Sequence, residues 1–270
     1  MTGSEKAPSL SELNGLAMRV VTWNVAGRVG SQPEQADALA ATSADIVTLQ
    51  EVTARTAPLW RASLADVGLT FCLDALDELP PKPTKRRLAV MTAARAELRR
   101  LPVPPMPWPE RVLHCTVDGI EVINVHSPIA PSPEMAKIRT HEAVAAHLSS
   151  SSSVPRILCG DLNTPRREHA DGSLLTFAHS SNGRLRPERG ERWDAAERAL
   201  IRELGWVDAF RTINGYGTRD ASWTFKDDRG GWRLDHVLLD GLEPVAAAYA
   251  HDWRRAGLSD HSALIVDLSW

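Results

Sequence analysis

The sequence is poor in several features that would assign it to a specialised class. Its 270 residues include only three cysteines, Cys72, Cys115 and Cys159, and none is spaced as a CxxC pair. Each lies in a strand-like run, so we expect core thiols in a reducing environment. No stretch approaches the roughly 18 consecutive apolar residues of a membrane span. Residues 1–16 are polar and lack the apolar core of a signal peptide; we expect a disordered lead-in and a cytoplasmic protein.

An excess of charge of one sign is also absent. The formal net charge is -3, which argues against a protein that coats DNA and restricts any nucleic-acid contact to local basic surface and metal ions. The hydrophobic content of 43% and the charged content of 24% are ordinary for a soluble globular enzyme. The sequence has no internal repeat and no sign of an obligate protein partner. We therefore expect one domain over residues 17–270.

What the sequence does contain is an alternation of strand-like and helix-like segments. Strands are expected at residues 18–23, 45–49, 69–73, 88–92, 96–100, 112–117, 121–125, 156–159, 223–225, 234–239, 245–249 and 262–268. Helices are expected at residues 33–41, 53–67, 132–148 and 194–204. This order predicts an α/β protein with two packed sheets and helices outside them.

Local signals add detail to this pattern. Two hairpins are expected: residues 88–92 with 96–100, and residues 112–117 with 121–125, the second joined by an Asp-Gly turn. Ser132 is expected to cap the third helix, with Pro133 in its first turn. Met135, Ile138, Ala145 and Leu148 would then share one face of that helix.

The most informative feature is a set of five short segments that end strand-like runs in polar residues. They are Thr22-Trp23-Asn24, Leu49-Gln50-Glu51-Val52, Gly160-Asp161-Leu162-Asn163, Arg233-Leu234-Asp235-His236 and Ser259-Asp260-His261. Strands that end in this way deliver their polar side chains to one rim of a sheet. One such segment alone is compatible with a turn or a helix cap. Five segments that carry carboxylate, amide or imidazole indicate an active site.

The residue types match the needs of phosphate ester hydrolysis. A hard divalent cation prefers oxygen ligands, for which Glu51 and Asp260 are the candidates. Asp161 is the candidate for orienting or deprotonating the attacking water. Asp235 is expected to orient and stabilise a charged His261.

Hydrogen-bond donors to the phosphoryl oxygens are needed as well. Asn24, Asn163 and His261 are the candidates. In a sixth segment, Val122-Ile123-Asn124-Val125-His126-Ser127-Pro128, His126 follows a strand and would protonate the leaving oxygen, hold the phosphate, or only satisfy a backbone carbonyl.

Other polar residues near these segments receive different expectations. Arg166 and Arg167, just after Asn163, are placed to bind phosphate in bidentate fashion. His236 directly follows Asp235 in a strand, so its side chain should face the opposite side and take no part in catalysis.

The ordered set TWN, LQEV, NVHS, GDLN, RLDH and SDH resembles the endonuclease/exonuclease/phosphatase superfamily of Mg-dependent phosphoesterases. The resemblance extends from about residue 18 to residue 268. It implies a four-layer α/β sandwich, two mixed β-sheets flanked by helices, and Mg²⁺ as cofactor, with Mn²⁺ as an alternative. The roles it implies are phosphate orientation and metal binding for Asn24 and Glu51, metal proximity for Asp260, water activation and transition-state contacts for Asp161 and Asn163, and an acid–imidazole pair for Asp235 and His261.

The branch of the superfamily determines the expected substrate. Residues 204–211, 222–225 and 231–235 are similar to exonuclease III-like apurinic endonucleases, which implies that Trp223 or Trp232 stacks beside an extruded nucleotide. His126, however, stands where that branch usually has tyrosine and resembles pancreatic-type deoxyribonucleases, and Ala26 replaces a common acidic residue. The motifs TWN, LQEV, GDxN and SDH are also similar to those of tyrosyl-DNA phosphodiesterases of the two-carboxylate type.

Three functions follow from these observations. We expect a DNA endonuclease or repair-type nuclease. The alternative is a phosphatase or phosphodiesterase acting on a small or lipid-headgroup phosphate ester with the same active site. The third, a binding module without catalysis, is disfavoured by the intact Glu51, Asp161, Asp235 and His261.

Overall fold

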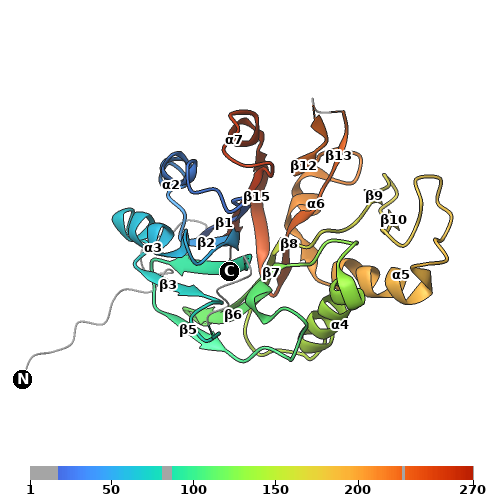
Figure 1. Ribbon diagram of the computed structural model, residues 1–270, viewed down its shortest axis with the longest axis horizontal. Helices are drawn as coiled ribbons and strands as arrows, with labels where there is room; N and C mark the ends of the chain where they lie inside the picture. The colour runs from blue at the N-terminus through green and yellow to red at the C-terminus, as the bar shows by residue number, and fades with distance from the viewer. Residues whose placement is uncertain (1–17, 81–86, 227–228, 270) are drawn as a thin grey trace, which may run out of the picture.

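Two six-stranded sheets form the centre of the molecule (Figure 1). The computed structural model describes residues 18–80, 87–226 and 229–269, and the expected lead-in, residues 1–16, lies outside them. The first sheet has the order β15-β16-β1-β2-β4-β3 and the second β11-β14-β8-β7-β6-β5. Only β1–β2 and β7–β8 pair in parallel among these neighbours, so both sheets are mixed.

The strands of the first sheet are β1 (Met18–Asn24), β2 (Ile46–Val52), β3 (Phe71–Asp74), β4 (Ala89–Ala94), β15 (Glu243–Ala250) and β16 (Ala263–Ser269). Those of the second are β5 (Leu98–Leu101), β6 (Val112–Val117), β7 (Ile120–His126), β8 (Arg156–Asp161), β11 (Val207–Asp208) and β14 (Asp235–Asp240). Two small hairpins lie apart from both sheets: β9 (Arg167–Glu168) with β10 (Leu174–Leu175), and β12 (Trp223–Thr224) with β13 (Gly231–Trp232).

Helices cover the outer face of each sheet. The helical segments are α2 (Gln32–Ala40), α3 (Ala57–Asp66), η1 (Pro109–Arg111), η2 (Pro133–Met135), α4 (Ala136–Leu148), α5 (Gly190–Arg198), η3 (Ala199–Glu203), α6 (Ala209–Asn214) and α7 (His251–Arg255). In Figure 1, α2 and α3 lie on the side of β1–β3, and α4 and α5 on the opposite side beyond β7 and β8. Among the described residues no helix is long and apolar enough to cross a membrane.

The burial pattern of the strands explains the layers. One core cluster joins both sheets through residues such as Val20, Ile46, Cys159 and Val237. A second cluster packs the other face of the first sheet, including Trp23, against Trp60 and Leu64 of α3. A third packs the second sheet against α4 and η3. Both faces of both sheets are thus buried, and the expected four-layer α/β sandwich is confirmed.

One expected hairpin is wrong and the other is confirmed. Strand β4 pairs with β2 and β3 in the first sheet, whereas β5 pairs with β6 in the second. The three residues 95–97 therefore cross between sheets rather than close a hairpin, a difference that strand periodicity does not encode. Strands β6 and β7 do pair, and Asp118 and Gly119 between them have φ of 47° and 81°, as a tight hairpin turn requires.

The third expected helix begins later than its sequence signals predict. Ser132 makes no side-chain capping bond, and Glu134 and Met135 have φ of 54° and 52°. These left-handed residues interrupt the helical path, so α4 begins at Ala136. Its expected apolar face is present, with Ile138 and Leu148 buried. The helix expected over residues 194–204 is divided into α5 and the π-helical η3.

Candidate active site

The ends of the central strands bring the predicted side chains together. His126 at the end of β7 lies opposite Asp161 at the end of the parallel strand β8, and Asp235 at the start of β14 lies opposite Asp161 on the other side. In β1, Val21 and Trp23 face α3 while Val20 faces the second sheet. By the period of two, Asn24 also points between the sheets. The candidate site therefore lies at the rim where the two sheets meet.

Glu51 reaches the site through an irregularity in its strand. The pairing of β2 with β4 shifts register between Leu49 and Val52, and Glu51 has a φ of 63°. A bulge of this kind re-aims one side chain out of the pleat. The Glu51 carboxylate consequently lies 3.4 Å from Asn24 Nδ2 and stays partly exposed to the cavity.

Asn24 connects carboxylates that belong to different sheets. Its Nδ2 donates to Asp161 Oδ2 at 3.0 Å as well as to Glu51, and its Oδ1 accepts from the Ala26 N–H at 3.0 Å. The amide oxygen is thus engaged by the backbone, and the face turned to the site is the donor. This geometry favours Asn24 as a hydrogen-bond donor over its predicted role as a metal ligand.

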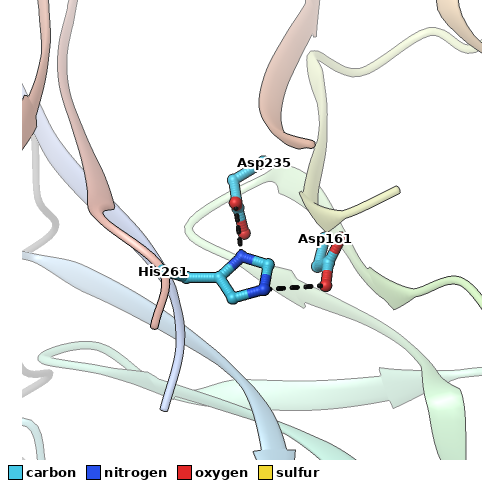
Figure 2. A group of neighbouring side chains, drawn as sticks. All are labelled: Asp161, Asp235 and His261. Atoms are coloured by element: carbon cyan, nitrogen blue, oxygen red, sulfur yellow. Dashed lines mark hydrogen bonds and ion pairs between the residues drawn. The ribbon is translucent and has the colours of Figure 1, made fainter. Parts of the chain in front are cut away.

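His261, Asp235 and Asp161 form a buried cluster, which Figure 2 shows with the imidazole between the two carboxylates. His261 Nδ1 lies 2.8 Å from Asp235 Oδ2, and its Nε2 lies 3.8 Å from Asp161 Oδ2. Burial by itself lowers the pKa of His261, but the two carboxylates raise it to about 10. The imidazole is therefore protonated at neutral pH, with Nε2–H directed toward Asp161.

The surroundings of Asp161 strongly change the pKa of its carboxyl group. Burial and the neighbouring Asp235 raise its pKa, the charge of His261 lowers it, and the net result is a pKa of about 7. Its Oδ1 accepts from the Asn163 N–H at 3.0 Å. A carboxylate that titrates near neutral pH is suited to accept a proton from water at that pH.

His126 lies beside the same carboxylates but in the neutral state. Its Nε2 is 3.7 Å from Glu51 Oε1 and 3.8 Å from Asp161 Oδ2. Burial, together with the positive charges of Arg111 and His261, lowers its pKa well below 6.5. The single N–H of a neutral imidazole is a very weak acid but a good hydrogen-bond donor, so the geometry favours the alternative in which His126 holds the phosphate.

Several residues at the site were not predicted from the sequence. Arg111 Nη1 lies 3.1 Å from His126 Nε2, and its guanidinium stacks 4.8 Å from the Trp108 ring centroid. Lys137 donates to the Asn163 backbone oxygen at 2.7 Å and forms a fully buried 2.6 Å ion pair with Glu197. Arg111 follows a proline-rich stretch and Lys137 lies within a helix, so neither belongs to a polar segment that ends a strand.

A polar link beneath the site holds the two sheets in register. Gln50 Nε2 of β2 donates to Asn124 Oδ1 of β7 at 2.9 Å, and Asn124 Nδ2 donates to the Met91 backbone oxygen at 2.8 Å. Both side chains are fully buried. The Gln50 side-chain oxygen has no hydrogen-bond partner, so the link rests on the amide N–H groups, and misaligned sheets would leave these donors unpaired as well.

The oxygen-rich donor set fits a hard divalent cation. Single ligand atoms of Asp161, Asp235 and His261 lie within 4.8 Å of one another, but His261 is protonated and is therefore a poor ligand. Asp235 Oδ1 is buried without a hydrogen-bond partner, and Glu51 and Asp260 face the same cavity. The carboxylates of this site outnumber its positively charged side chains, and such a surplus of oxygen ligands favours the binding of Mg²⁺ or Mn²⁺.

The cavity above these residues has a volume of about 440 Å³. The predicted Asn163, Arg166, Trp223 and Trp232 all line it, whereas Arg167 is exposed and lines a neighbouring pocket instead. The rings of Trp223 and Trp232 stack at 5.1 Å with an interplanar angle of 9°.

Two further predictions concern side chains around this cavity. Asn163 Nδ2 donates to the Ser127 backbone oxygen at 2.8 Å, so its amide also holds the loop after β7. His236 is buried on the opposite side of β14, where its Nε2 lies 2.8 Å from the Thr164 backbone oxygen. The expectation that His236 faces away from the site agrees with this position.

Comparisons with known proteins are consistent with this geometry. The profile of the Endonuclease/Exonuclease/phosphatase family matches residues 21–261. The chain belongs to this family. It is a phosphoester-hydrolysing enzyme, and the resemblance drawn from the six motifs is confirmed. No curated protein matches the sequence.

Solved structures with the same fold cover nearly the whole chain. An AP endonuclease from Archaeoglobus fulgidus has 21% identity and a TM-score of 0.68, covering 92% of this chain and 98% of its own. The 3'-5' exonuclease NExo from Neisseria meningitidis has 23% identity and a TM-score of 0.64, covering 94% of this chain and 100% of its own. At these identities the likeness shows a shared fold.

Proposed function

We propose that this family member is a metal-dependent phosphodiesterase acting on DNA, as an endonuclease or repair-type nuclease. The observation that carries the proposal is the buried cluster of Asp161, Asp235 and His261, of which Asp161 and His261 line the same cavity as the Trp223–Trp232 stack. The cluster provides hydrolytic groups, and the aromatic pair provides a surface for a base or sugar. The fold is shared with an AP endonuclease and with a 3' phosphatase described as bound to a product DNA hairpin, which supports a DNA substrate here.

The roles of the residues follow from their protonation states. Glu51 and Asp260 would hold Mg²⁺, with Asp161 beside them, and the metal would supply charge neutralisation of the phosphate. Asp161, with its pKa near 7, accepts a proton from the attacking water. His261, held protonated by Asp235, donates Nε2–H to a phosphoryl oxygen. Asn24, Asn163 and the neutral His126 complete the donors around the phosphate.

A cleavage panel tests this function. The substrates are duplex DNA, duplex DNA with one abasic site, single-stranded DNA and a soluble phosphodiester, each with Mg²⁺, Mn²⁺ or EDTA. Metal-dependent nicking that is abolished by EDTA and by Asp161→Ala is the expected result. Preference for the abasic duplex would assign apurinic endonuclease activity. Cleavage that persists in well-folded Asp161→Ala would contradict the proposed role of Asp161.

A small phosphate ester is the second candidate substrate. The observation that favours it is the limited cavity volume of about 440 Å³, combined with the net charge of -3. Turnover of the soluble ester with no cleavage of any DNA would support this candidate over the first.

A further inference from the structure

Two groups of opposite charge line the active-site cavity. Arg166, Arg186 and Arg189, here termed the basic wall, are near enough to act on one another electrostatically, and Glu51, Asp161 and Asp260 are here termed the acidic floor. Arg166 lies in the loop between β8 and β9, and the other two come from the segment before α5. Of these three arginines the sequence predicts phosphate binding only for Arg166, because the segment at residues 183–192 has the composition of a solvated loop.

These three arginines have little of the ion pairing that a structural role would bring. Within the described part of the chain Arg166 makes no hydrogen bond or ion pair, and its guanidinium lies 5.9 Å from the Phe177 ring centroid. Arg186 has one partner, the exposed Glu188 at 3.6 Å, and its buried Nε has no acceptor. Arg189 donates to the Phe177 backbone oxygen and stacks over Trp193.

The three charges also repel one another. Burial lowers the pKa of Arg166, and the nearby Arg186 lowers it further. Burial and Arg186 likewise lower the pKa of Arg189, against the opposing effect of Glu197. Other arginines of this protein are matched differently: Arg156 and Arg198 each bond a carboxylate at 2.6–2.7 Å. Three like charges that have, among the residues the structure describes, only one exposed carboxylate within ion-pair distance, Glu188, favour the binding of an anion.

We propose that Arg166, Arg186 and Arg189 form a second phosphate subsite, which binds a phosphate group of the substrate next to the one that is hydrolysed. The guanidinium fork matches a phosphate oxygen pair, which explains why arginines fill this wall. The subsite rests on the proposed function, since it assumes that the hydrolysed phosphate binds at the acidic floor.

Aromatic rings line the same cavity as the two charged groups. The Phe177 ring meets the Trp232 ring edge-on at 5.1 Å, and both line the cavity. An aromatic surface in a cavity that also holds basic residues suits a nucleotide unit, which presents a base for stacking and phosphates for the arginines. The second phosphate is either a neighbouring backbone diester or a terminal monoester. Both present at least two non-bridging oxygens that a guanidinium can bind.

Binding measurements test the subsite without requiring catalysis. Calorimetry would compare the Kd of thymidine 3',5'-bisphosphate with that of each thymidine monophosphate. The wild-type protein should bind the bisphosphate at least about tenfold more tightly, because two phosphates engage two sites. Arg186→Met, and separately Arg166→Met, should abolish this preference. Arg184→Met is the matched control: it removes an exposed arginine of the same loop outside the cavity and should retain the preference.

Hydrolysis of short oligonucleotides then identifies the source of the second phosphate. TpT has only the cleaved diester, TpTpT adds a neighbouring diester, and pTpT adds a terminal monoester. A higher kcat/KM for TpTpT indicates a backbone phosphate, and a higher kcat/KM for pTpT indicates a terminal one.

Two outcomes overturn the subsite. They are equal binding of mono- and bisphosphates by the wild type, and a bisphosphate preference that survives in Arg166→Met and Arg186→Met. A bisphosphate preference without hydrolysis of any oligonucleotide would instead retain the subsite and contradict the proposed function.

Discussion

Two ionic clusters lie on opposite sides of β14, and they differ in charge balance. The catalytic cluster comprises Glu51, Asp161, Asp235 and His261, with three carboxylates to one imidazolium. The second, here termed the ion-pair network, comprises Glu168, Asp208, Arg211 and Arg233, with two carboxylates to two buried guanidiniums; the partly exposed Arg202 lies 3.9 Å from Glu168 at its edge. In the network Arg233 bonds Asp208 at 2.6 Å and Glu168 at 2.7 Å, and Arg211 bonds Glu168 at 2.7 Å.

The pKa values of carboxyl groups are shifted in opposite directions in the two clusters. Burial acts to raise the pKa of Glu168, but Arg233 and Arg211 lower it to about 2. Asp161 is equally buried, yet its pKa rises to about 7, because one imidazolium does not offset burial and the nearby Asp235. A balanced cluster keeps its charges fixed and stabilises the fold. An unbalanced one retains a group that exchanges protons near neutral pH and attracts a cation.

The largest expected effect is the loss of the Asp161 carboxylate from the catalytic cluster. Asp161→Asn should lower kcat by roughly 10⁴-fold, since the proton acceptor is removed. The free energy of unfolding should stay equal or rise, because the substitution also removes an incompletely compensated buried charge. Steady-state kinetics and urea denaturation of the same preparation measure both quantities. A large loss of stability in Asp161→Asn would end the distinction between the two clusters.

Removal of a carboxylate from the ion-pair network should have the reverse signature. Glu168→Gln leaves two buried guanidiniums with one carboxylate, and should lower the free energy of unfolding by roughly 3–5 kcal/mol. The kcat of the remaining folded protein should change little, because Glu168 does not line the active-site cavity. Urea denaturation with kinetics well below the midpoint gives both values. An unchanged midpoint would show that the network adds no stability.

The network should also determine how stability responds to acid. Because the pKa of folded Glu168 is about 2, against an ordinary value of 4.5, its contribution is fully present above pH 4.5. This contribution, roughly 3 kcal/mol, should disappear as the pH falls toward 2. The pH dependence of urea unfolding for wild type and Glu168→Gln measures it. Parallel curves between pH 4.5 and 3 would contradict the assignment to Glu168.

The smallest expected effect concerns His236, whose position alternates with that of Asp235 on β14. His236→Leu removes the hydrogen bond to the Thr164 backbone oxygen and should cost about 1–2 kcal/mol of stability. Its kcat should remain within about threefold of wild type, whereas His261→Leu, which removes a phosphoryl donor, should lower kcat by at least about 100-fold. Comparable losses of kcat in both variants would contradict the separation of the two faces.

How much the sequence could predict depended on where a residue stands. Asn24, Asp161 and His126 end runs of β-branched and aliphatic residues, so both their position at the rim of a sheet and their proximity to one another could be inferred. The crossing of residues 95–97 between the sheets could not, because a short polar connection is compatible with either arrangement. Arg111, Lys137 and Arg186 were missed for a related reason: they come from irregular or helical segments whose position depends on packing.

The sequence by itself determined which chemical groups end the central strands and in which family they occur, since strand periodicity and motif order are local properties. Only the tertiary structure decided their charge states and roles. Asp161 and Glu168 are both carboxylates in short polar segments, and no local pattern separates them. Their pKa values differ because each depends on burial and on the charges that distant segments bring within a few ångströms: His261 and Asp235 for the one, Arg211 and Arg233 for the other.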